Sequence, residues 1–394
     1  MKNIKVLIIF KYLHPQWNTP VINQFSDYYY TEHLYLSEYK NKNFTEIVKV
    51  INILIKSKNI EIVVFDVDYF KFINFFFIEK IQCKKKVLIT GDDFELHELN
   101  SITASACDVV LSHCPLSVLK YKEKGYEAYN IQFEYSPKDE LKKQDYKNKK
   151  EIDVLFFGNL TPDRKDILNF IEEQGIALKN IGHEGDVEVS DDELLKLISK
   201  AKITIDLSKS RGTESVKSYS SENIYQFYYQ FKARITKAGL NNSACVSEYS
   251  PGLELLYDKD EVPSFFTKEE CVKILKNLLN DSELLEKCTK KLSTKTHYLC
   301  NEKISFKHVY HALEKSKFRK VKLVKFPYWY LRIAAKQIIL RNINLLTFFK
   351  NMGQFNVIFS IIRNSSLSVK FLILTESVLN KLWYTLLSTF KLKR

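Results

Sequence analysis

The chain has 394 residues, of which 45% are hydrophobic, a composition typical of a globular protein with room for two ordinary domains. Ten glycines and eight prolines exclude collagen-like and low-complexity proteins, and an odd number of cysteines, seven, argues against a complete disulfide framework. The formal net charge of +13 is unevenly placed, because residues 315–394 contain sixteen Lys and Arg and a single acid.

The first part of the chain alternates predicted strands and helices. Strands are expected at 3–10, 60–65, 86–90 and 108–112, and helices at 43–58 and 115–124. The helix at 43–58 is indicated by Phe44, Ile47 and Ile51, which share one face at helical spacing. Strands that alternate with helices predict a parallel sheet with helices on both faces.

A highly charged segment that is poor in apolar side chains, 137–151, is expected to be the linker between two domains. The pattern then restarts, with strands expected at 154–157, 204–207 and 244–246, and helices at 166–174, 191–200, 268–280 and 281–295. The predicted organisation is a Rossmann-like domain at 1–136, the linker at 137–151, a second Rossmann-like domain at 152–314 and a helical tail at 315–394.

The segment 231–257, FKARITKAGLNNSACVSEYSPGLELLY, carries the strongest candidate binding site. Lys232 and Arg234 lie on a predicted helix, Glu248 follows a short strand, and a Pro-Gly turn opens a second helix with Glu254 in its first turn. Cations and helix N-terminal amides hold phosphates, and a carboxylate accepts hydrogen bonds from ribose hydroxyls, so a nucleotide-diphosphate site is plausible. The pattern alone favours an ordinary αβα unit with surface charges.

The tail at 315–394 interleaves its cations with large apolar and aromatic side chains. This pattern favours contact with an anionic membrane surface. The alternatives are a helical layer packed against the two domains, and a nucleic-acid-binding segment, for which the chain lacks a recognised module. The most apolar stretch, 367–390, contains Lys370, Glu376 and Lys381, so lying in the membrane interface costs less than spanning it.

Several of these segments resemble the GT-B glycosyltransferases, in particular the branch similar to spore-maturation CgeB-like proteins. The resemblance extends over about residues 85–313. The matching residues are Arg234, Glu248, Tyr249, Leu253 and Glu254 in the second half, Phe156-Phe157-Gly158-Asn159 and Arg164 at its beginning, and Asp92-Asp93-Phe94 with Asp108-Val109-Val110 in the first half. The chain departs from the family at Lys237, Asn242 and Tyr229, where relatives carry an acid, a glycine and another acid.

The resemblance implies a GT-B-like fold, with two Rossmann-like domains facing a cleft, and a metal-independent glycosyltransferase without a cofactor. Its donor would be a nucleotide sugar. The membrane contact expected of the tail suggests that the acceptor is a glycan or a lipid-linked molecule at the cytoplasmic face of the membrane. Arg234 would neutralise the donor diphosphate. The implied donor-binding residues are Gly158, Asn159, Arg164, Lys232, Arg234, Glu248 and Glu254.

Candidate catalytic residues lie in the first half, after the strand predicted at 86–90. Asp92 and Asp93 stand at its carboxyl end, where open α/β sheets bind ligands, and either could accept the proton of an acceptor hydroxyl. His97 is a second candidate base. The alternative is that a carboxylate at this position caps the following helix.

Two other functions remain open. Asp66 and Asp68 form a D-x-D tripeptide at a strand end, which resembles the metal signature of GT-A glycosyltransferases and would hold a divalent ion on the diphosphate. The charge reversal at Lys237 also fits a non-catalytic glycan-binding or scaffold protein.

Overall fold

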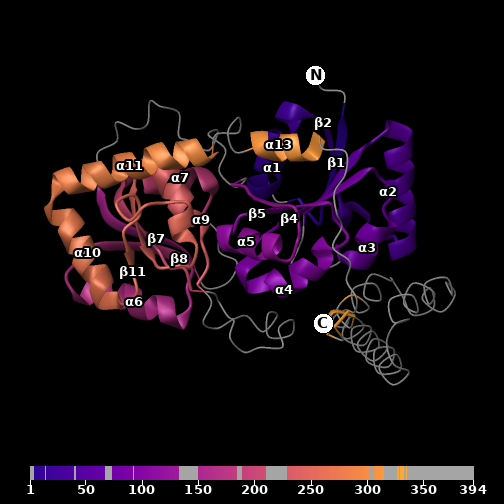
Figure 1. The fold of residues 1–394 in the computed structure, drawn as a ribbon. Coiled ribbons are helices and arrows are strands. Elements are labelled where there is room, and N and C mark those ends of the chain that lie inside the picture. The colour runs from indigo at the N-terminus through magenta and orange to yellow at the C-terminus, as the bar shows by residue number, and fades with distance from the viewer. Residues whose placement is uncertain are drawn as a thin grey trace, which may run out of the picture.

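The computed structural model describes residues 4–132, 150–209 and 229–314, apart from gaps at 14, 40, 67–72, 92, 184–188 and 301–305, together with 326, 327, 329–331 and 334. Two sheets form the centres of two α/β domains (Figure 1), and every strand pairing in both sheets is parallel. The predicted fold class is confirmed.

The first domain is built on a six-stranded sheet with the order β2-β1-β3-β4-β5-β6. Its strands are β1 (Lys5–Phe10), β2 (Tyr30–Tyr35), β3 (Ile62–Asp66), β4 (Lys85–Thr90), β5 (Val109–Ser112) and β6 (Ala128–Asn130). Its helices are α1 (Pro15–Tyr28), η1 (Leu36–Tyr39), α2 (Phe44–Lys58), α3 (Phe75–Lys80), α4 (Asp93–Ala104) and α5 (Pro115–Glu123). The apolar runs of β3 and β5 are buried because helices cover both faces of the sheet.

The second domain has a five-stranded sheet with the order β11-β10-β9-β7-β8. Its strands are β7 (Ile152–Asn159), β8 (Leu178–His183), β9 (Ala201–Asp206), β10 (Ala244–Glu248) and β11 (Ser264–Phe265), and its helices are α6 (Pro162–Glu173), α7 (Asp191–Lys200), α9 (Ala233–Leu240), η5 (Leu253–Leu255), α10 (Lys268–Asn280) and α11 (Ser282–Cys300). The helix predicted after the Pro-Gly turn is only the short 3₁₀ helix η5, because Gly252 precedes it in a left-handed conformation with φ of +93°.

After the second domain the chain returns to the first. Helix α13 (Lys307–Glu314) lies against α1 and β1 (Figure 1), and Phe306 and Val309 are fully buried beside Phe25 and Tyr29. Further along, Tyr330 packs between α3 and α4 of the same domain. The described residues of the tail therefore pack against the first domain.

The hydroxyl of Tyr330 makes the specific contact in this packing. It accepts a hydrogen bond from the backbone amide of Phe75 at 2.8 Å, and it lies 3.1 Å from the hydroxyl of Thr103. Phe75 is the first residue of α3, so Tyr330 satisfies an amide that has no partner within its helix. The membrane contact predicted for 315–394 otherwise falls outside the described residues, and no helix in the described part is long and apolar enough to cross a membrane.

Candidate active site

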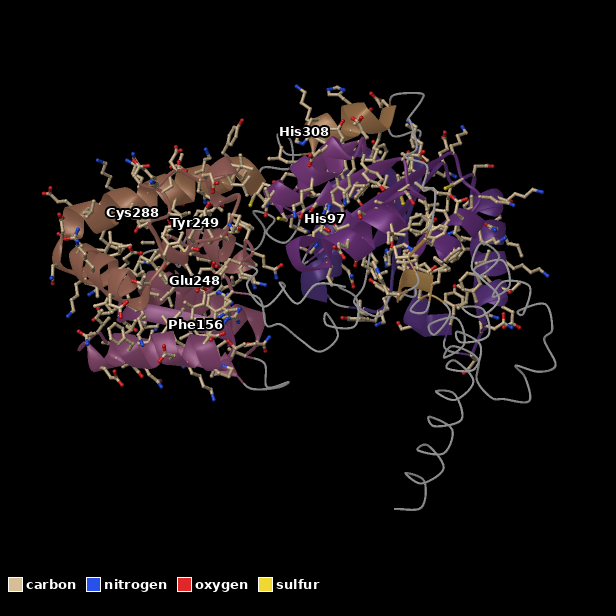
Figure 2. The ribbon with its side chains drawn as sticks, turned by 60° about the horizontal axis from the view of Figure 1, so that its bottom comes forward. His97, Phe156, Glu248, Tyr249, Cys288 and His308 are labelled. Carbon is tan, nitrogen blue, oxygen red and sulfur yellow. The ribbon has the colours of Figure 1, made fainter. Side chains whose placement is uncertain are left out.

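The residues predicted to bind the donor in the second domain lie at the carboxyl edge of its sheet. Strands β7, β9 and β10 are neighbours in the order β10-β9-β7, and they end at Asn159, Asp206 and Glu248. Because parallel strands end at the same edge, residues more than 80 positions apart in sequence meet there. Figure 2 labels Phe156, Glu248 and Tyr249 in this domain.

Arg234 is the central residue of this edge. It lies in the first turn of α9 and is only 8% exposed, and its Nε donates to the Oδ1 atom of Asp206 at 2.7 Å. Its Nη2 donates to the carbonyl of Leu207 at 2.7 Å, and its Nη1 to the carbonyl of Phe157 at 3.3 Å. The guanidinium thus joins α9 to the ends of β7 and β9 and leaves two of its five N–H groups without a protein acceptor in the described residues.

Asp206 is the partner that makes this arrangement stable. Its side chain is fully buried, and its second oxygen accepts a hydrogen bond from the hydroxyl of Ser247 at 3.1 Å. A buried carboxylate is costly unless it is paired and hydrogen-bonded, and both oxygens of Asp206 meet that requirement. The sequence analysis passed over Asp206, although an acid that closes the apolar strand 201–205 is a signal for a group at the ligand-binding edge.

Gly158 is required by the position of the same guanidinium. Its φ is +113°, and a Cβ atom placed on it would lie 2.8 Å from Nη1 of Arg234. A side chain here would therefore be strained by the backbone and would also displace the arginine. The structure brings Gly158 and Arg234 together, as the prediction of one donor site requires.

Arg164 holds the two loops that flank the site. It is 4% exposed and donates to the carbonyl of Asn159 at 2.7 Å and to the carbonyl of Lys209 at 3.1 Å. Helix α6 begins close by, where the hydroxyl of Thr161 accepts a hydrogen bond from the Arg164 amide. This Thr-Pro start was missed in the sequence, where the helix was expected only from residue 166.

Glu248 closes the cluster at the end of β10. Its carboxylate accepts a hydrogen bond from the amide of Lys209 at 3.0 Å and from the hydroxyl of Ser208 at 3.5 Å. Burial raises the pKa of Glu248, while the Lys209 amide and the charge of Arg164 act in the opposite direction. The ammonium of Lys209 pairs with Asp163 at 2.9 Å, which places one more cation at this edge.

Two other predicted donor residues lie at the margin of the cluster. Lys232 is the N-cap residue of α9, two positions before Arg234, and it is half-buried. Glu254 is exposed on η5 and accepts a hydrogen bond from the hydroxyl of Tyr249 at 3.3 Å. The ring of Tyr249 packs against that of Phe266, with ring centres 4.8 Å apart.

In the first domain, Asp93 is buried in a network of side chains. It accepts hydrogen bonds from Thr90 at 2.9 Å, Asn100 at 2.9 Å, Ser112 at 2.7 Å and Tyr121 at 2.8 Å. These donors are all side chains, and α4 begins at Asp93 itself, so the capping alternative concerns Asp92. Four hydrogen bonds use its acceptor capacity within the domain, and Asp92 lies outside the described residues.

His97 belongs to the same buried region (Figure 2). Its ring centre lies 4.5 Å from that of Tyr121, and its Nε2 atom is 3.4 Å from the ammonium of Lys124. Burial lowers the pKa of His97 to about 4, with the nearby Asp93 opposing that change and Lys124 adding to it. The imidazole is therefore neutral at physiological pH.

The two domains touch through the turn that follows β10. A Cβ atom on Gly252 would lie 3.1 Å from the Cβ atom of Leu116 and 3.4 Å from the ring of Pro115, both in the first turn of α5. This contact places the carboxyl edge of the second sheet beside the start of a first-domain helix.

The described residues offer no evident metal centre. They contain no group of three or more His, Cys, Asp or Glu side chains placed to hold a metal ion. Asp66 ends β3, and Asp68 of the predicted D-x-D signature lies outside the described residues.

No protein-family model matches the chain, and no curated protein matches it. Among solved structures it is similar to Anabaena Alr3699/HepE in complex with UDP and glucose, with a TM-score of 0.53, 10% identity and coverage of 79% of this chain and 99% of that one. It is also similar to sucrose-phosphate synthase from Thermosynechococcus elongatus, with a TM-score of 0.53, 9% identity and the same coverage. The chain has the GT-B fold. The likeness to the CgeB-like branch stays a prediction.

Proposed function

We propose that the protein is a glycosyltransferase whose nucleotide-sugar donor binds at the carboxyl edge of the second sheet. The observation that carries this proposal is the convergence of Arg164, Arg234 and Glu248 on neighbouring strand ends of a GT-B fold. The fold alone would not imply an activity, but cations and an acid at this edge supply what a nucleotide diphosphate needs.

Arg234 is proposed to bind the diphosphate with the two N–H groups that it does not donate to the protein. Its position is fixed by Asp206 and two carbonyls, so little reorganisation would accompany binding. Lys232, at the start of the same helix, adds positive charge. As the bond from the sugar to the diphosphate breaks, these cations stabilise the negative charge that develops on the leaving oxygen.

Glu248 and Glu254 are proposed to bind hydroxyls of the ribose or the sugar. Glu248 is held by Lys209 and Ser208, and Glu254 by Tyr249, so both carboxylates have defined positions. Gly158 and Asn159 form the floor of the site, where the absent side chain of Gly158 leaves room for the guanidinium. No metal or cofactor takes part in this proposal.

The acceptor is proposed to bind on the first domain, and to be a glycan or a lipid-linked molecule. The supporting observation is the Gly252–Leu116 contact, which sets the start of α5 beside the donor edge. Asp92 is the proposed base, because Asp93 and His97 are enclosed in the buried network. The sixteen cations at 315–394 support attachment to the cytoplasmic face of an anionic membrane.

The proposal is tested by thermal stabilisation of the full chain with UDP, GDP and UDP-glucose, with and without EDTA. A ligand at one hundred times its Kd stabilises the native state by about 2.7 kcal/mol, so a rise of a few degrees in Tm is expected, unaffected by EDTA. Lys232→Glu should weaken this rise, whereas Lys273→Glu, on an exposed position of α10, should preserve it.

The outcomes separate the three candidate functions. Binding followed by release of the nucleoside diphosphate supports the transferase. Binding without hydrolysis or transfer favours the non-catalytic glycan-binding protein suggested by Lys237. A Tm rise abolished by EDTA favours the metal-dependent transferase, and the absence of any shift overturns the donor site.

A further inference from the structure

A cavity lies at the opposite, amino-terminal edge of the second sheet. It has a volume of about 410 Å³, is open to solvent, and lies between α11 and the residues that precede or begin β7, β9 and β10. It is lined by Lys150, Lys202 and Asn242 from the sheet side, and by Ser282, Leu285, Glu286, Thr289, Lys290, Ser293 and Thr294 from α11. This volume falls within the range of small-molecule sites.

Lys150 places a buried ammonium in the wall of this cavity, and burial lowers the pKa of this group to about 8. Its ammonium donates to the carbonyls of Ser199 at 2.9 Å, Ala201 at 2.9 Å and Asn242 at 2.6 Å. All three of its N–H groups are thereby used, so Lys150 attracts a ligand by its charge and does not donate to it. Asn242 adopts a left-handed conformation with φ of +53°, which turns its carbonyl toward this ammonium.

Other groups of the cavity are available to donate. Ser293 is 8% exposed and lines the cavity, where its hydroxyl can donate a hydrogen bond. Lys290 lies three residues before it on α11 and forms no ion pair with any described residue. Lys202, by contrast, is already paired with Asp153 at 2.6 Å.

A serine hydroxyl and the exposed ammonium of Lys290, in a cavity whose wall also carries the ammonium of Lys150, match the phosphate of a small molecule. Leu285 adds an apolar surface for the remainder of such a ligand. We propose that this cavity binds a small phosphorylated metabolite of about the size of a sugar phosphate, with its phosphate on Lys290 and Ser293 near Lys150.

The cavity is separate from the proposed donor site, because it lies at the opposite ends of the same strands. Lys150 also stands where the segment connecting the two domains enters the second one. Through its three carbonyl acceptors, it ties that entry point to the end of α7 and to the residues that begin β9 and precede β10. A ligand here would therefore strengthen the junction between the connecting segment and the second sheet.

The test is a titration of the full-length protein with glucose 6-phosphate, followed by thermal stabilisation in the presence of saturating UDP. The UDP occupies the proposed donor site, so a remaining rise in Tm reports on a second site. Lys290→Glu should weaken the apparent affinity roughly tenfold, since it replaces an attractive charge by a repulsive one. Lys287→Glu makes the same charge change on an exposed position of α11 outside the cavity and should bind as the wild type does.

Ser293→Val provides a second, uncharged variant at the cavity wall and should also weaken binding. Loss of the shift in the Lys290 and Ser293 variants, with its retention in the Lys287 variant, supports the site. The proposed site is overturned if glucose 6-phosphate does not raise the Tm of the wild type. It is also overturned if the rise is equal in the wild type and in the Lys287, Lys290 and Ser293 variants. A shift that disappears in Lys232→Glu instead assigns the sugar phosphate to the donor edge, and also overturns this proposal. If UDP fails to bind, the titration is carried out without it, so the two proposals fail independently.

Discussion

Replacing Arg234 should destabilise the second domain as well as abolish nucleotide binding. In Arg234→Met the fully buried carboxylate of Asp206 loses its charge partner, and the carbonyls of Phe157 and Leu207 lose their donors. Removing one member of a buried ion pair costs about 3–5 kcal/mol, against a total stability of about 5–15 kcal/mol for a typical domain. We therefore expect the free energy of unfolding to fall by about 4 kcal/mol.

The double variant Arg234→Met with Asp206→Leu separates the two effects. It removes the isolated buried charge, so it should recover about 1–3 kcal/mol of the loss while still failing to bind UDP. Urea denaturation should be followed by far-UV circular dichroism, because the three tryptophans, Trp17, Trp329 and Trp383, all lie outside the second domain. A loss below about 1 kcal/mol in the single variant would refute the reasoning that Arg234 braces the sheet.

Three further predictions concern glycine, tyrosine and histidine positions. Gly158→Ala should cost about 1–3 kcal/mol in urea denaturation, and more than Gly175→Ala, since both have positive φ but no atom lies within 4 Å of a Cβ at Gly175. Tyr330→Phe should cost about 1–3 kcal/mol because two polar groups lose their partner, whereas the exposed Tyr298→Phe should be neutral in the same assay. Burial lowers the pKa of His97 to about 4 from 6.5, so the unfolded chain binds more protons than the folded protein between these pH values. The free energy of unfolding should therefore fall as the pH drops from 6.5 to 4, by about 3 kcal/mol at pH 4. His97→Gln should remove that part of the pH dependence, and equal slopes in both proteins would contradict it.

The fold could be predicted from the sequence wherever local signals and burial agree. Strands β3 and β5 open with continuous apolar runs, and α2 is preceded by Asn43 with a complete capping box. Helix α1 was not predicted, because Pro15 and Pro20 indicate a break, yet the first opens the helix and the second is accommodated within it.

The candidate site could be predicted only in part. Arg234 and Glu248 were indicated by their charges on either side of a short strand, and Arg164 by the resemblance to GT-B glycosyltransferases. The sequence could not reveal the hydrogen-bond partners of these residues. Asp206 lies 28 residues from Arg234 along the chain, and Phe157, whose carbonyl accepts from Arg234, lies 77 residues from it. Asp93 shows the same limit, because its four donors come from three different elements and the end of β4.

The return of the chain to the first domain has a consequence for how the protein folds during synthesis. Residues 4–132 leave the ribosome first, but the apolar surface around Phe25 and Tyr29 is covered only when Phe306 and Val309 have been made. The first domain to be translated is therefore the last to be completed, and its uncovered face is a target for chaperones until then. A polypeptide that stops after α11 would keep that face exposed and would be prone to aggregate.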